Sequence, residues 1–114
     1  MSKSKAKGTS WETEIVNTLR SKWWPHAERR TLSGTHDKGD INLHPDVVIE
    51  AKDHGTLKFS QWISEAEKER LNAGASIGVV WAKRRGKASA SDAYVVMTGE
   101  QFIELLKRSG LGGK

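Results

Sequence analysis

Residues 39–52 read Gly-Asp-Ile-Asn-Leu-His-Pro-Asp-Val-Val-Ile-Glu-Ala-Lys, and they carry most of the information on the architecture of this chain. Two runs rich in apolar and β-branched residues, 40–43 and 47–52, flank the segment His44-Pro45-Asp46. Such runs on either side of a short polar segment with a proline predict two antiparallel strands joined by a three-residue turn.

A hairpin that pivots on Pro45 places residues at equal distances from Pro45 opposite each other. It predicts the pairs Leu43–Val47, Ile41–Ile49 and Asp40–Glu50. Directly opposed residues project to the same face of a sheet, with Cβ atoms about 4.5–5.5 Å apart. Lys52 lies two residues beyond Glu50 and therefore shares that face. The sequence thus predicts two carboxylates and one ammonium side by side.

Two adjacent carboxylates repel each other unless a cation lies between them. Mg²⁺ suits such a site because it takes oxygen ligands, keeps several waters and accepts phosphate oxygens from a substrate. A neighbouring lysine can hold or polarise a water near the metal. Asp40, Glu50 and Lys52 together are therefore typical of metal-assisted hydrolysis of a phosphodiester. The alternative is a surface hairpin in which these three side chains form only salt bridges.

The segment before the hairpin predicts an amphipathic helix from Thr9 to about Trp24. Thr9 and Glu12 have the spacing of a capping box, and Pro25 ends the helix. The apolar stripe consists of Trp11, Ile15, Val16, Leu19 and Trp23. At about 100° per residue, Glu12 falls inside this stripe and Glu14 falls on the solvent side. A glutamate inside an apolar stripe is costly unless it is paired or metal-bound, so Glu12 is either a further carboxylate of the site or the capping partner of Thr9.

The remaining patterns predict three strands and two helices. The strands are expected at 27–32, 77–82 and 93–97, the first helix at 61–73 between Ser60 as cap and Gly74 as stop, and the second from the capping box of Thr98 and Gln101 to about Arg108, ended by Gly110. The element order is α-β-β-β-α-β-β-α, an α/β domain with a mixed central sheet flanked by helices. We expect this domain at residues 9–110, with a flexible basic tail at 1–8 and a flexible C-terminus at 111–114.

Charge and composition narrow the class of protein. The 114 residues contain 19 Lys plus Arg against 14 Asp plus Glu, and the excess is clustered at Lys3, Lys5, Lys7, at Arg29 and Arg30, and at 83–87. Clustered basic charge favours nucleic acid as the partner. The chain has no cysteine, which excludes disulfides and thiolate metal sites. No apolar run reaches the roughly 20 residues that span a bilayer, so we expect a soluble protein with no membrane partner. We expect it inside the cell, in the cytoplasm or nucleoid, or in the host cytoplasm if it is viral.

Three motifs resemble those of the PD-(D/E)xK nuclease superfamily and, within it, the Holliday junction resolvases of the archaeal type. Residues 8–16, Gly-Thr-Ser-Trp-Glu-Thr-Glu-Ile-Val, resemble the opening glycine and catalytic glutamate of the family's first helix. Gly39-Asp40-Ile41 resembles its metal-binding aspartate at a strand start, and Val48-Ile49-Glu50-Ala51-Lys52 resembles its apolar-apolar-Glu-x-Lys strand. The resemblance covers about residues 8–82 and implies a restriction-endonuclease-like fold.

The resemblance also implies a function: a metal-dependent, structure-selective DNA endonuclease that hydrolyses phosphodiester bonds at four-way junctions, in DNA recombination and repair. It implies that Glu12, Asp40 and Glu50 bind a divalent metal with the carbonyl of Ala51, and that Lys52 orients the attacking water. The metal would be Mg²⁺, with Mn²⁺ as the alternative. Family members act as homodimers that nick two symmetry-related strands.

Several polar residues are candidates for binding nucleic acid. They are Arg29, Arg30, Ser33, Lys58, Gln61, Lys83, Arg84, Arg85 and Lys87. Some relatives have an essential serine before the aspartate, and Ser33 is the nearest candidate here. Lys58 and Gln61 lie near the start of the second helix, where related nucleases often use such a residue.

A second set of residues is apolar and suggests a surface for a second copy. Phe102, Ile103, Leu105 and Leu106 span most of a helical wheel and cannot all face one core. Together with Trp23 and Trp24 they are expected to supply the dimer surface.

Two other functions remain open at this point. One is a DNA nuclease that cuts other substrates, as restriction and repair nucleases do. The other is a non-catalytic, basic nucleic-acid-binding domain whose carboxylates form only salt bridges.

Overall fold

The computed structural model describes residues 3–30 and 39–112. Its elements are α1 (Lys3–Lys22), β1 (Glu28–Arg29), β2 (Ile41–His44), β3 (Val47–Lys52), α2 (Phe59–Ala73), β4 (Ile77–Ala82), the 3₁₀ helix η1 (Ala90–Asp92), β5 (Tyr94–Val96) and α3 (Gly99–Ser109). The predicted α-β-β-β-α-β-β-α order is confirmed, with η1 added in the loop before the last strand. Within the described ranges, no helix combines the length and apolar character needed to cross a bilayer.

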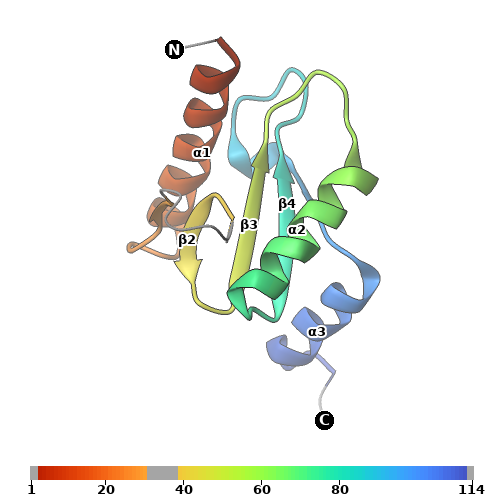
Figure 1. The fold of residues 1–114 in the computed structure, drawn as a ribbon. Helices are drawn as coiled ribbons and strands as arrows, with labels where there is room; N and C mark the ends of the chain where they lie inside the picture. Colours follow the sequence, from red (N-terminus) through yellow and green to blue (C-terminus); the bar gives the residue numbers. More distant parts are fainter. Residues whose placement is uncertain (1–2, 31–38, 113–114) are drawn as a thin grey trace.

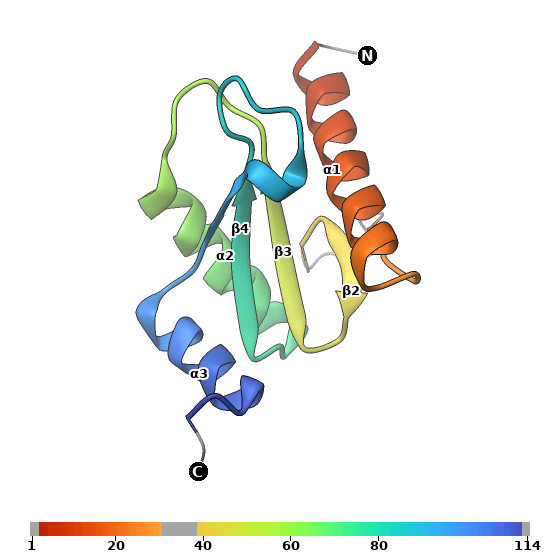
Figure 2. The same cartoon turned by 180° about the vertical axis from the view of Figure 1, so that it is seen from behind.

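The five strands form one mixed sheet in the order β1-β2-β3-β4-β5. β3 and β4 are parallel, and the other neighbouring pairs are antiparallel. The parallel pair requires a crossover, which α2 supplies. α1 and α2 lie on opposite faces of the sheet, and α3 lies near the end where β4 begins (Figures 1 and 2). The predicted α/β domain with a mixed sheet flanked by helices is confirmed.

Successive side chains of β3 and β4 point to opposite faces of the sheet, so the hydrophobic core has one part on each face. On one face the stripe of α1 (Trp11, Ile15, Val16) packs in one cluster with Ile41, Ile49, Ile77 and Val79. On the other face Val80 and Ala82 pack with Trp62 and Ala66 of α2. Because Glu50 and Lys52 have even numbers like Val80 and Ala82, β3 presents them on the α2 face.

Two predicted helix starts are wrong. α1 begins at Lys3, so Thr9 and Glu12 lie inside the helix and form no capping box. Lysine and alanine are good helix formers, which favours helix through the segment before Thr9. Ser60 lies inside α2, whose cap position is Lys58 and carries no side-chain cap bond.

The predicted helix ends are confirmed. Gly74 and Gly110 follow α2 and α3 with φ of +67° and +77°. Thr98 caps α3 as expected by accepting a hydrogen bond from the N–H of Gln101. The side chain of Gln101 does not complete a capping box, because its Oε1 accepts from the N–H of Gly78.

The hairpin differs from the prediction at its turn. Ile41 pairs with Ile49 as expected, but His44 rather than Leu43 pairs with Val47, and a bulge separates the two pairs. The turn therefore consists of Pro45 and Asp46 only. Asp46 connects this turn to the residue before β4 and to α3. Its Oδ1 accepts a hydrogen bond from the N–H of Ser76, and its Oδ2 forms an ion pair with Arg108.

Candidate metal and nucleic-acid site

Asp40 is positioned by the chain just before β2. Its N–H donates to the carbonyl of Ile49 (2.9 Å), and its Oδ2 accepts from the N–H of Ala51 (2.8 Å). Gly39 precedes it with a φ of +95°, and a Cβ there would lie 2.9 Å from Cγ1 of Val48 and 3.0 Å from the carbonyl oxygen of Ile49. Only glycine fits this conformation and this close approach. Gly39 thus allows Asp40 to turn onto β3.

Glu50 and Lys52 extend from β3 toward α2. Nζ of Lys52 lies 3.6 Å from Oε1 of Glu50 and 2.8 Å from Oε2 of Glu65 on α2. Glu50 is buried, and its Oε2 has no hydrogen-bond partner among the described residues. A buried oxygen without a donor is rare in a folded protein, and either a bound cation or a proton shared with the neighbouring carboxyl of Glu69 would satisfy it.

The electrostatics of the site favour the uncharged form of both carboxyls. The pKa of Asp40 is raised to about 8, mainly by burial and secondly by repulsion from Glu50. The hydrogen bond from the N–H of Ala51 acts in the opposite direction and lowers this pKa. Burial, followed by the nearby carboxyl of Glu69 on α2, raises the pKa of Glu50 to about 9. Burial lowers the pKa of Lys52, but its contact with Glu65 and the neighbouring carboxylates outweigh this and raise it overall. The charge of Lys52, which is shared with Glu65, thus does not outweigh the burial of the two carboxyls.

These residues line a cleft of about 320 Å³. Its lining is Lys7, Gly8, Glu12, Asp40, Glu50, Ala51, Lys52, Asp53, His54 and Gly55. Four residues that the sequence assigned to metal binding, Glu12, Asp40, Glu50 and Ala51, are among them. The carboxylate of Glu12 is held by Arg29, whose Nε donates to Oε1 over 3.0 Å. Within 3–30 and 39–112, no three histidine or carboxylate side chains form a group able to hold a metal ion.

The prediction that Glu14 faces solvent is wrong. Its Oε2 accepts hydrogen bonds from the N–H of Ala90 (3.0 Å) and the hydroxyl of Thr18 (3.1 Å). It therefore ties η1 to α1, a role that the helical wheel alone did not reveal.

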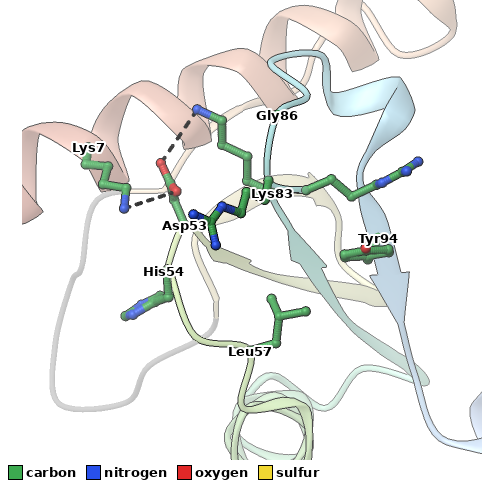
Figure 3. Close-up of a pocket in the computed structure, with 10 residues that line it drawn as sticks. Lys7, Asp53, His54, Leu57, Lys83, Gly86 and Tyr94 are labelled. Atoms are coloured by element: carbon green, nitrogen blue, oxygen red, sulfur yellow. Dashed lines mark ion pairs between the residues drawn. The ribbon is translucent and has the colours of Figure 1, made fainter.

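A basic pocket of about 480 Å³ adjoins the cleft and shares four of its lining residues, Lys7, Asp53, His54 and Gly55. Asp53 lies between two lysines, with Oδ1 3.5 Å from Nζ of Lys7 and Oδ2 3.9 Å from Nζ of Lys83 (Figure 3). Arg84 and Arg85 complete the basic side of the pocket. The acidic cleft thus opens onto a cationic surface.

The predicted nucleic-acid-binding residues separate into two groups. Lys83, Arg84 and Arg85 line the basic pocket. The others do not line it: Lys87, Lys58 and Gln61 are exposed, Arg29 pairs with Glu12, and Arg30 contacts Oδ1 of Asn42 at 3.5 Å. Ser33 lies outside the described residues.

Sequence reasoning missed several residues of the site. Glu65 and Glu69 lie on α2 one turn apart, and Glu69 is buried. Ala66 belongs to the apolar stripe of α2, and Glu69 follows it by three residues and so falls on the same side of the helix. The helical wheel that singled out Glu12 could therefore have identified Glu69 too. Lys7 was assigned to a tail and Tyr94 to an ordinary strand. No local sequence pattern shows that these two residues lie close to the site in the folded chain.

Comparisons of the chain with protein-family models, with curated proteins and with solved structures find no match. A function is therefore inferred from the cleft and the basic pocket.

Proposed function

We propose that this protein is a metal-dependent, structure-selective DNA endonuclease that cleaves four-way junctions and has a restriction-endonuclease-like fold. One observation carries the proposal: Asp40, Glu50 and Lys52 lie in one cleft that opens onto a basic pocket. Phosphodiester hydrolysis needs both parts, because carboxylates hold the metal and cations hold the polyanionic substrate.

The donor set of the cleft suits a hard divalent cation. Its candidate ligands are carboxylate and carbonyl oxygens, which Mg²⁺ and Mn²⁺ prefer. Oε2 of Glu50 is buried without a partner, and a cation beside it would satisfy that oxygen. Asp40, Glu50 and the carbonyl of Ala51 would hold the metal. Glu12, which lies on α1 and also lines the cleft, would be a further ligand.

The chain's own residues have distinct roles in this proposal. A bound divalent metal supplies Lewis-acid activation of the phosphodiester and of a water. Lys52, held by Glu65 at 2.8 Å, donates a hydrogen bond to the attacking water and keeps it in position. The N–H of Ala51 fixes the orientation of Asp40. Lys7 and Lys83 bind phosphates next to the one that is cut.

A comparison with the pKa of Asp46 supports the proposal over the alternative in which Asp40 and Glu50 form only salt bridges. Hydrogen bonds from Arg108 and then Ser76 lower the pKa of Asp46 to about 2, as expected for a structural pair. The pKa values of Asp40 and Glu50 shift in the opposite direction. Paired groups with raised pKa values inside a cleft are more typical of functional sites.

The deciding experiment measures nicking of supercoiled plasmid in Mg²⁺ and in EDTA, and then cleavage of a four-way junction and a linear duplex at equal concentration. The proposal expects Mg²⁺-dependent nicking and a preference for the junction. Equal cleavage of both substrates would leave a general DNA nuclease. DNA binding without any nicking would leave a non-catalytic binding domain.

The loop after β4 should contribute phosphate contacts. Replacing Lys83, Arg84, Arg85 and Lys87 by Gln should weaken duplex binding and flatten its salt dependence. Each lost phosphate contact lowers the log–log slope of affinity against salt by about 0.9. A double Lys68→Gln, Lys107→Gln variant, which removes exposed charges from α2 and α3, should keep the slope. An unchanged slope in the loop variant would mean that this loop does not contact DNA.

Paired cuts at a junction require two sites, and we propose that a second copy of the chain supplies the other. The sheet face opposite α2 has an apolar groove of about 540 Å³, which is lined by residues from the end of α1, from the sheet and from α3. Trp23, Trp24, Val95 and Leu105 line it. Phe102, Ile103 and Leu106 are also exposed on α3, as the helical wheel predicted, but Ile103 lines a different pocket with Arg70 and Ser76. A twofold dimer buries one such self-complementary surface in each copy.

The expected result is a homodimer at micromolar concentration, twice the 12.7 kDa chain mass, in sedimentation experiments. Leu105→Glu should yield monomer, because it places a charge in the groove. Leu71→Glu changes an equally apolar, exposed residue on α2 and should stay dimeric. A wild-type monomer, both free and on a junction, would remove the dimer from the proposal.

A further inference from the structure

The basic pocket beside the cleft has an apolar side that phosphate binding does not require. Tyr94 and Leu57 both line the pocket and are 39% and 44% exposed. In Figure 3 they lie on the opposite side of the pocket from Lys7 and Asp53. A surface that binds only phosphates does not need these two partly exposed side chains.

The ring of Tyr94 is fixed before any ligand binds. Tyr94 pairs with Ala82 across β4 and β5, and its ring meets Phe59 of α2 edge-on at a centroid distance of 5.9 Å. The guanidinium of Arg84 lies 5.6 Å from the ring centroid, and its Nη1 donates to the carbonyl of Asp92 (3.3 Å). Aromatic rings and arginine planes are the usual stacking partners of unpaired bases.

The volume of the pocket fits a ligand larger than a phosphate. At about 480 Å³ it falls in the range of about 300–1,000 Å³ that is typical of small-molecule sites. Its cations are Lys7, Lys83, Arg84 and Arg85, so a ligand with an aromatic ring and adjacent phosphates matches its two sides.

We propose that this pocket binds one unpaired nucleotide of the strand to be cut. The base stacks on Tyr94 beside Leu57, and the phosphates that flank it contact Lys7 and Lys83. This inference rests on the proposed nuclease function and identifies the feature of the substrate that the site selects.

The pocket then accounts for selectivity between DNA structures. A continuous duplex must unstack a base to fill it, and this cost is least where the base is already unpaired. Because the pocket and the cleft share Lys7 and Asp53, filling the pocket places the neighbouring phosphate near Asp40 and Glu50. A branch or a bulge is therefore cut in preference to a perfect duplex.

Binding in EDTA tests this inference separately from catalysis. Three fluorescent duplexes are compared by anisotropy: one with a single unpaired nucleotide, the same duplex with an abasic residue there, and a fully matched one. Wild-type protein should bind the unpaired nucleotide about 10-fold more tightly than the abasic residue. Tyr94→Phe should keep this difference and Tyr94→Leu should lose it, with the salt slope unchanged in both.

The outcomes distinguish the nucleotide pocket from the nuclease activity. Equal affinity of the wild-type protein for the base and the abasic residue overturns the nucleotide pocket, whether or not Tyr94→Leu folds. A full difference retained in folded Tyr94→Leu overturns it as well. A base-dependent difference without Mg²⁺-dependent nicking supports the pocket and contradicts the nuclease. Nicking without such a difference supports the nuclease alone.

Discussion

Asp40→Ala protein is expected to bind a four-way junction within several-fold of wild type and to leave it uncut in Mg²⁺. Affinity for DNA comes mostly from cations at phosphates, and none of these is changed. The chemistry needs both carboxylates and the positioned water, so cleavage by Asp40→Ala, Glu50→Gln or Lys52→Ala should fall at least about 100-fold. Single-turnover cleavage with saturating protein measures this rate apart from binding.

Two exposed residues provide matched controls. Glu100→Gln removes a carboxylate from α3, and Lys68→Ala removes a lysine from α2. Both should cut at the wild-type rate. Full activity in Asp40→Ala would exclude the cleft as the active site, even if the protein nicks DNA.

Metal-free protein is expected to lose stability as the pH rises from about 5 to 9. The carboxyls of Asp40 and Glu50 titrate near pH 4 in the unfolded chain and near pH 8 and 9 in the folded one. The folded chain therefore holds more protons in this window. The stabilisation is complete below pH 4 and is lost progressively until both folded-state carboxyls have ionised, through pH 8 and 9.

Glu50→Gln should flatten this dependence, since it removes one titrating group and the charge that repels Asp40. The free energy of unfolding is measured with urea in EDTA across the pH range, with Glu100→Gln as the control that keeps the wild-type slope. Mg²⁺ should stabilise the wild type at pH 8 more than Glu50→Gln, because only the wild type retains both carboxylates. Parallel pH profiles for wild type and Glu50→Gln would contradict the raised pKa of Glu50.

The sequence was sufficient for the part of the fold that local patterns control. The strands at 47–52 and 77–82 and the stops at Gly74 and Gly110 follow from apolar runs and glycine chemistry, and all are confirmed. The pairing of Ile41 with Ile49 is also confirmed, and it brings Asp40 and Glu50 together. The carboxylate pair was predictable because one hairpin supplies both members.

Contacts between distant segments were not predictable in the same way. Asp53 and Lys83 directly follow the paired strands β3 and β4, and the packing of α1 against the sheet brings Lys7 to them. Glu14 was misplaced because a helical wheel does not include η1, which covers that side of α1. The capping box at Thr9 failed because α1 continues through Gly8 into the Lys- and Ala-containing segment before it.

The bulge in β2 divides the hairpin into two halves that can vary independently. Pairing at Ile41–Ile49 fixes the end near Asp40, whereas the irregular stretch before His44 absorbs the mismatch with the turn. A change of one residue in turn length can therefore be accommodated by gain or loss of the bulge, without a register slip that would rotate Asp40 away from Glu50. The end of the hairpin near Asp40 is therefore intolerant of insertion and deletion, and at the turn such a change must keep the contacts of Asp46 with Ser76 and Arg108.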